Sequence, residues 1–293
     1  MEAWATETGS SALVVSADGA VVFELVTPRS DSLIHTMSVT KSVASLAIGR
    51  MLQDGQLNSL DLKLSEIFPE WRQGRKAQIT LRHLLTHSTG LQDDPNAGVE
   101  IEPAPDVVQL ALAAELTEAP GDAFRYNNKA ANLLAAIVEK LTGQKLDDYL
   151  SRSVFADLGI LDSEWLKDAA GNPYGMAGLS LRARDLLKVG QLMNNRGDWH
   201  GTQLVPSSFV DETLTPQRED NARVGLLWWL VEDPPSGYQA NGWLGQWLVG
   251  LPKIDAVAVR LVDRADAVTG ENTTGFLELM GEILADEAPI SDP

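Results

Sequence analysis

The sequence contains no cysteine among its 293 residues. This absence excludes disulfide bonds, thiol nucleophiles and thiolate metal sites. No apolar run approaches the roughly 18 residues that a membrane-spanning helix needs, and the strongest run, residues 224–231, has the length of a strand. Residues 1–7 are acidic and lack the basic and apolar regions of a signal peptide. We therefore expect a cytoplasmic protein with no membrane partner.

Basic residues are scarce relative to acidic ones. Lys and Arg number 23 against 41 Asp and Glu, which gives a net charge of −18 and argues against a nucleic-acid partner. The P-loop, Gly-x-Gly-x-x-Gly and the Gly-x-Ser-x-Gly of α/β-hydrolases do not occur. The chain is long enough to bury a large core as one domain or two lobes.

The most informative stretch begins at Ser38. From residue 39 onward apolar residues recur at helical spacing, which predicts a buried helix over about 38–53 that ends at Asp54-Gly55. On such a helix Ser38 and Lys41 lie on one face and can touch. The positive end of the helix dipole disfavours a charged ammonium, and a neutral amine can take the proton of a serine hydroxyl. Backbone N–H groups at this end also favour an oxyanion.

Ser38 and Lys41 by themselves favour a plainer interpretation. Serine is common at helix caps, so the pair is also typical of a capping serine followed by a surface lysine. Against this, Ser-x-x-Lys occurs nowhere else in the chain, and here it opens a strongly apolar helix. Motifs elsewhere in the chain must decide between the two interpretations.

Strand and helix patterns predict an α/β protein of the α+β type. The predicted strands lie near both ends of the chain, over residues 13–15, 21–23, 225–231, 246–251 and 256–262. The predicted helices include 81–87, 107–116, 130–141, 146–150, 181–194 with Ser180 as its cap, 206–214 and 273–285. We expect one antiparallel sheet flanked by helices and assembled from both ends, plus a mostly helical lobe, with the active site at the seam.

The expected organisation is a single catalytic domain over residues 1–293. Its α/β lobe would comprise 1–55 and 185–293, and its mostly helical lobe 56–184. Residues 92–106 form a long loop with three prolines and five acids, which could border a pocket. Asp93 and Asp94 in this loop could attract a cationic substrate, although solvated charge is the more frequent role of such residues.

Three motifs resemble those of the serine β-lactamase and penicillin-binding-protein family. They are Ser38-Val39-Thr40-Lys41, Leu81-Arg82-His83-Leu84-Leu85-Thr86-His87-Ser88-Thr89-Gly90-Leu91 and Tyr126-Asn127-Asn128. Their order and spacing together are specific, although each alone would be weak. The likeness extends over about residues 10–285 and is closest to the branch of class C β-lactamases, D-aminopeptidases and carboxylesterases.

The resemblance implies roles for the site residues. Ser38 would be the acylated nucleophile, Lys41 the general base and Tyr126 the residue that relays protons. A phenol beside an ammonium can indeed act as an acid or base. Tyr126 taken alone is more typical of a core tyrosine, but Tyr-x-Asn occurs nowhere else in the chain. Asn128 resembles the residue that orders the lysine and contacts the substrate amide. It could also cap the helix predicted to start near residue 130.

The remaining family motif, usually Lys-Thr-Gly or His-x-Gly on the strand beside the site, is where this sequence departs. Its best match is Ala240-Asn241-Gly242, followed by Trp243. The alignment implies an oxyanion hole from the N–H groups of Ser38 and Trp243, and Gly242 would let the substrate approach the backbone. Ala240 replaces a basic residue that in the lactamases helps to bind the substrate carboxylate. We therefore expect weak or no β-lactamase activity.

His83 and His87 lie four residues apart, as in a zinc helix, but Leu84 stands where zinc proteases need a glutamate. Packing or hydrogen bonding of the following loop explains the pair better than a metal. We expect no metal and no organic cofactor.

The sequence thus predicts a serine hydrolase that acts through a covalent acyl-enzyme on a small ester or amide, of carboxylesterase or amidase and D-aminopeptidase type. The alternative is a catalytically impaired, penicillin-binding-like protein that binds or traps acyl ligands without efficient turnover. Ala240 is the sign in favour of the alternative, and the intact Ser38, Lys41 and Tyr126 speak against it.

Overall fold

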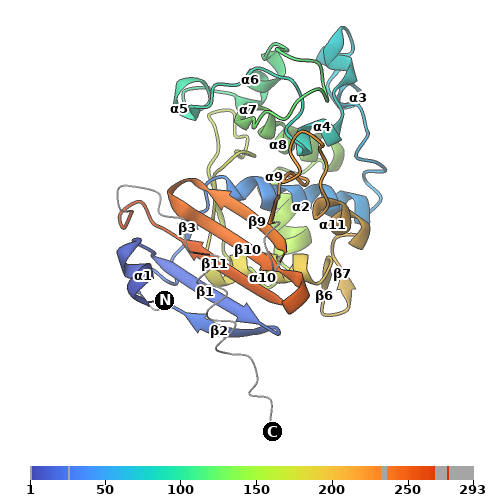
Figure 1. The fold of residues 1–293 in the computed structure, drawn as a ribbon. Helices are drawn as coiled ribbons and strands as arrows, with labels where there is room; N and C mark the ends of the chain where they lie inside the picture. Colours follow the sequence, from blue (N-terminus) through green and yellow to red (C-terminus); the bar gives the residue numbers. More distant parts are fainter. Residues whose placement is uncertain (1, 26, 232–235, 268–275, 277–293) are drawn as a thin grey trace.

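A computed structural model describes residues 2–25, 27–231, 236–267 and 276 (Figure 1). Its main sheet has six antiparallel strands in the spatial order β2-β1-β11-β10-β9-β8, so the two ends of the chain meet in one sheet. These strands are β1 (Ala12–Ala17), β2 (Ala20–Glu24), β8 (Trp229–Val231), β9 (Gly237–Gly242), β10 (Gln246–Leu251) and β11 (Ala256–Leu261). The predicted fold class, an antiparallel sheet with flanking helices, is confirmed.

The strand pattern explains how the sheet is buried on both faces. In β11 the side chains of Val257, Val259 and Leu261 belong to the main hydrophobic core, while Ala258 belongs to a second cluster on the opposite face. This is the alternation that a period of two requires. The second cluster also contains Ala5 of α1 (Glu2–Glu7).

Helix α2 (Val39–Gln53) crosses the middle of the molecule, between the sheet and a group of helices (Figure 1). It contacts β9 and β10 on one side and α8 (Leu133–Thr142) and α9 (Leu146–Leu150) on the other. The other helices of this group are α3 (Leu64–Ile67), α4 (Leu81–Leu85), α5 (Ala97–Glu100), α6 (Val107–Ala113) and α7 (Asn128–Ala131). The proposed lobe boundaries, after residues 55 and 184, stay a prediction.

The remaining elements are short, apart from α10 (Ala183–Asn194), which packs on the main-core face of the sheet. They are β3 (Ile34–His35), β4 (Glu164–Trp165), β5 (Leu179–Leu181), β6 (Asp198–Trp199), β7 (Thr202–Gln203) and α11 (Ser207–Thr213), with single helical turns at Pro69–Trp71, Arg75–Gln78, Ser151–Phe155, Trp243–Gly245 and Pro252–Ile254. Within the described ranges no helix has the length and apolarity to cross a membrane.

Tertiary pairing changes two of the predicted helices. Ser180 does not cap a helix, because it lies in β5 and pairs with His35 of β3 and Glu164 of β4. The helix predicted over 130–141 is divided at Asn132 into α7 and α8. The predicted helix over 273–285 lies outside the described residues, apart from residue 276.

Gly190 lets α10 lie close to the sheet. A Cβ atom at this position would be 2.4 Å from Cγ1 of Val257. We expect Gly190→Ala to lower the free energy of unfolding by about 1–3 kcal/mol, because overpacking a close contact forces side chains to shift. Urea unfolding would measure this, and Val257→Ala in the same chain should offset part of the loss. A Gly190→Ala protein as stable as the wild type would contradict the tight contact.

Candidate active site

Ser38 occupies the N-cap position of α2, yet its side chain makes no capping hydrogen bond. Its Oγ instead accepts a hydrogen bond from Nζ of Lys41 at 3.0 Å. Lys41 is 2% exposed. The interpretation as a capping serine followed by a surface lysine is therefore wrong, and the first turn of α2 presents a hydroxyl and an amine in direct contact.

The amine of Lys41 is held from three sides. Besides Ser38, its Nζ donates to the backbone oxygen of Met176 at 2.7 Å and lies 4.9 Å from the centre of the Tyr126 ring. The backbone N–H of Met176 donates to Oδ1 of Asn132 at 3.1 Å, which positions the Met176 carbonyl. Asn132 is completely buried. No motif in the sequence points to Asn132, although an amide in the middle of an apolar helical pattern is a usable signal.

Tyr126 lies on a segment whose backbone is anchored at each step. Phe124 N–H donates to the Asp220 carboxylate at 2.7 Å, and Arg125 N–H donates to the backbone oxygen of His87 at 2.8 Å. Hydrogen bonds from Arg218 and then from Phe124 N–H lower the pKa of Asp220 to about 2, so it remains an acceptor at neutral pH.

The Tyr126 ring itself lies between two aromatic neighbours. Its centre is 4.6 Å from the centre of the His87 ring and 6.2 Å from that of Trp229, with which it stacks. Tyr126 is 38% exposed. Tyr126 is therefore not a core tyrosine; it faces the space next to Ser38 and Lys41.

The helix-capping role expected of Asn128 belongs to its neighbour Asn127. Oδ1 of Asn127 accepts from Ala130 N–H at 2.6 Å, so Asn127 rather than Asn128 caps α7. Asn128 lines a cavity next to Ser38. The backbone N–H groups of Asn128 and Lys129 donate to Asp93, whose pKa is raised by burial in spite of these bonds. Asp93 thus holds the start of α7.

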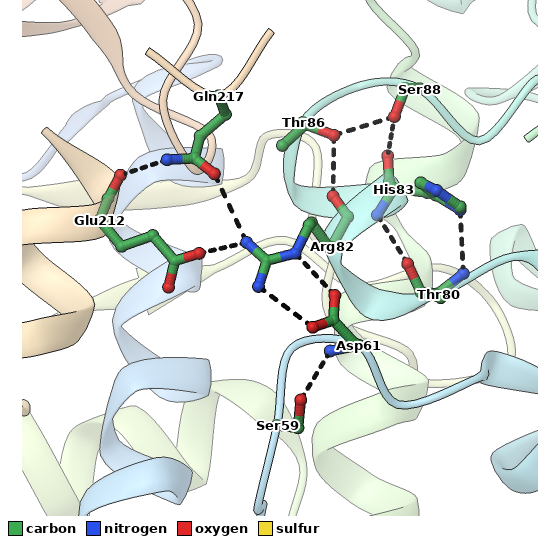
Figure 2. A network of polar contacts seen from close by, with 9 residues as sticks. All are labelled: Ser59, Asp61, Thr80, Arg82, His83, Thr86, Ser88, Glu212 and Gln217. Carbon is green, nitrogen blue, oxygen red and sulfur yellow. Dashed lines mark hydrogen bonds and ion pairs between the residues drawn. The ribbon is translucent and has the colours of Figure 1, made fainter. Parts of the chain in front are cut away.

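The two histidines of the zinc-like pair both accept backbone hydrogen bonds. Nδ1 of His83 accepts from Thr80 N–H at 3.2 Å, and the Thr80 hydroxyl accepts from His83 N–H, a capping box at the start of α4 (Figure 2). Nδ1 of His87 accepts from Asn127 N–H, also at 3.2 Å. In the described part of the chain no three His, Asp or Glu residues are grouped as a metal site.

Arg82 fixes α4 against two other segments. Its guanidinium binds Asp61 at 2.7 Å and also contacts Glu212 of α11 and Gln217 (Figure 2). On the other side of α4 the Thr86 hydroxyl donates to the Arg82 carbonyl and hydrogen-bonds with Ser88. This network holds the turn that carries His87. No local pattern in the sequence predicts this network, because its partners are up to 135 residues apart.

The end of β9 differs in detail from the expected substrate-binding strand. Ala240 is completely buried in the main core, so it lines neither of the two cavities at Ser38. The substrate-binding role expected for Ala240 is therefore wrong. A Cβ atom at Gly242 would lie 2.6 Å from the backbone oxygen of Thr36. Glycine is thus required by the segment that leads into Ser38. The close approach of a substrate to the backbone at Gly242 stays a prediction.

Two cavities meet at Ser38. The smaller has a volume of about 10 Å³ and is lined by Ser38, Lys41, Ser42, His87, Tyr126, Val224, Leu227, Trp228, Trp229 and Asn241. The larger has a volume of about 640 Å³ and is lined by His35, Met37, Ser38, Pro95, Asn96, Ala97, Gly98, Glu102, Asn128, Leu166, Tyr174, Met176, Ala177, Gly178, Trp243 and Arg264. The structure thus brings Ser38, Lys41, Tyr126 and Asn241 together, and places Asn128 and Trp243 on the other side of Ser38.

The chain is similar to known proteins in sequence and in fold. A family model described as Beta-lactamase matches residues 3–277. Esterase EstB from Burkholderia gladioli is 30% identical over 153 residues, which cover 46% of this chain and 38% of that protein. The matched stretch thus spans well under half the length of this relative.

Solved structures share the fold over almost the whole chain. A Bacillus anthracis protein described as a candidate 6-aminohexanoate-dimer hydrolase has a TM-score of 0.83 at 19% identity, covering 98% of this chain and 80% of its own. EstCE1, described as a hydrolase with promiscuous acyltransferase activity, has a TM-score of 0.76 at 19% identity, covering 97% and 96%. At these identities the similarity shows the fold alone.

Burial of His87 makes stability depend on pH. Burial, and secondly the charge of Lys41, lower the pKa of His87 to about 3 from the usual 6.5. The unfolded chain therefore binds a proton at this histidine more readily than the folded chain. The contribution of His87 to the free energy of unfolding is complete above pH 6.5 and is lost as pH falls towards 3. We expect His87→Asn to reduce the pH dependence of unfolding between pH 6 and 4 by up to about 1.4 kcal/mol per pH unit.

Asparagine is the suitable replacement because its side-chain oxygen can still accept from Asn127 N–H. It also tolerates the positive φ of 52° that His87 adopts. Urea unfolding at several pH values would compare the two proteins. Parallel pH dependences for wild type and His87→Asn would contradict the buried neutral imidazole.

Proposed function

Since the chain belongs to the beta-lactamase family, we propose that it is a serine hydrolase in which Ser38 forms an acyl-enzyme with a small ester or amide. The observation that carries the proposal is the 3.0 Å hydrogen bond between the buried Lys41 amine and the Ser38 hydroxyl. A nucleophile in direct contact with a base is the arrangement that covalent catalysis needs. Tyr126 borders the same small cavity.

In the proposed reaction Ser38 Oγ attacks the substrate carbonyl carbon while Lys41 accepts the hydroxyl proton. The oxyanion that forms is stabilised by the N–H groups of Ser38 and Trp243. Tyr126 passes a proton to the leaving alkoxide or amine as its bond to the carbonyl carbon breaks. Water then hydrolyses the ester on Ser38. No step calls on a metal or an organic cofactor.

The lining of the larger cavity favours an apolar acyl group as the part of the substrate that binds there. Its lining includes Met37, Met176 and Tyr174. Leu166 and Trp243, which also line it, are each 57% exposed. Exposed apolar side chains around a pocket are typical of a ligand-binding site. One relative is named an esterase, which makes esters the first substrates to test.

The expectation of weak or no β-lactamase activity is kept as part of the proposal. Strand β9 offers no cation to the larger cavity, and Arg264, which lies over the Trp243 ring, is the one lysine or arginine in the lining. The alternative of an impaired acyl-binding protein rested on Ala240. Because Ala240 packs in the core, that residue no longer favours it.

A serine variant tests the nucleophile. With a p-nitrophenyl ester, we expect Ser38→Ala to lower kcat by at least about 1,000-fold, as loss of an acylated serine does in other hydrolases. Intact-protein mass spectrometry with a fluorophosphonate should show one adduct on the wild type and none on Ser38→Ala. The matched control is the exposed Ser151→Ala, which should keep wild-type activity. An adduct that persists in Ser38→Ala would place the nucleophile elsewhere.

A pH series tests the base. Because the base must be neutral to accept the Ser38 proton, we expect kcat/KM for acylation to rise with pH between 5 and 9. His87, with its pKa of about 3, stays neutral over this range and cannot cause the rise. Lys41→Gln should lose most of the activity and the pH dependence together. A wild-type rate that is constant from pH 5 to 9 would count against Lys41 as the base.

A further inference from the structure

Asn241 lines the small cavity and has a side-chain oxygen without a protein partner. Its Oδ1 is fully covered and accepts no hydrogen bond from the protein, although the residue lines the cavity beside Ser38. Buried polar atoms in folded proteins almost always have a partner, and ordered water supplies it where the protein does not. The cavity next to Asn241 is therefore the place to look for that partner.

His87 lines the same cavity. Its Nδ1 is occupied by the N–H of Asn127 at 3.2 Å, so a neutral ring must carry its proton on Nε2. The low pKa of about 3 keeps the ring neutral. The residues that line the cavity thus include an amide from β9 that can accept a hydrogen bond and an imidazole from the turn after α4 that can donate one.

The size of the cavity matches a single water molecule. Its volume is about 10 Å³, and one water needs about 10–15 Å³ and two to four polar partners. Lys41 and Tyr126 are further polar groups in the lining. We propose that this cavity is a one-water site formed by Asn241 and His87, and that the water bound there is the nucleophile that releases the acyl group from Ser38. The inference rests on the proposed function.

Hydrolysis of the Ser38 ester needs only the water and the protein groups of the site. The water oxygen forms a bond to the carbonyl carbon of the Ser38 ester, and one water proton passes to Lys41, directly or through Tyr126. The oxyanion then collapses, the bond from carbon to Ser38 Oγ breaks, and Oγ takes the proton back. A carboxylic acid leaves through the larger cavity. His87 is too weak a base to accept the proton, so it binds and orients the water.

Pre-steady-state kinetics with p-nitrophenyl butyrate separates acylation of Ser38, seen as a burst, from hydrolysis of the acyl-enzyme, seen as the steady-state rate. Asn241→Leu removes the acceptor, and His87→Asn removes the donor while keeping an acceptor for Asn127. For both variants we expect a burst rate within about twofold of wild type and a steady-state rate at least 10-fold lower. The acyl-enzyme should then accumulate to about one equivalent in intact-protein mass spectrometry.

Matched controls come from the same elements. Gln239→Leu changes a second amide of β9, whose Oε1 is likewise buried and unpartnered but which does not line the cavity. His83→Asn changes the other histidine whose Nδ1 accepts a backbone N–H. Both should keep wild-type burst and steady-state rates. Asn241→Thr retains an acceptor oxygen and should recover part of the steady-state rate that Asn241→Leu loses. This variant controls for a folding defect in Asn241→Leu.

A second readout uses methanol as a competing nucleophile. Methanol is too large for a site of one water, so we expect the ratio of methyl ester to free acid to rise in Asn241→Leu and His87→Asn. Equal losses of burst and steady-state rates with a raised KM would mean that Asn241 contacts the substrate, and would overturn the water site. Unchanged deacylation would overturn it too. Absence of any burst or adduct on the wild type would overturn the proposed function and this inference together.

Discussion

The hydrogen bond between Lys41 and Ser38 depends on keeping a buried amine in one position. An amine without water needs acceptors from the protein, and here they are the Ser38 hydroxyl and the Met176 carbonyl. Met176 in turn is positioned by Asn132, which divides α7 from α8. Positioning the Lys41 amine thus involves α2, the segment before β5, and the junction of α7 and α8.

Tyr126 completes the site from a segment with little regular structure. Its neighbours are held by side chains from three other places, namely His87, Asp220 and Asp93. Arg82 adds an anchor for the turn of His87 through Asp61 and α11 (Figure 2). These contacts replace the backbone ladder that a strand or helix would provide, so a loop can position a phenol as a regular element does.

Several differences between prediction and structure share a cause. The pattern at Ser180 is locally that of a helix cap, but pairing with β3 and β4 draws the residue into a strand. Ala240 aligns with a substrate-contacting position, yet the alternation of β9 turns it into the core and leaves Asn241 at the cavity. In each case an alignment or a local preference could not report which face another element would cover.

The sequence by itself determined the apolar helix that carries Ser38 and Lys41, the strands at both ends of the chain and the order of the family motifs. These are local properties, because helical spacing places residues three apart on one face and alternation selects the strand faces. Only the tertiary structure decided that Tyr126, His87 and Asn241 border one small cavity with Ser38. Contacts between residues up to about 200 positions apart depend on how the elements pack, and no local pattern encodes that packing.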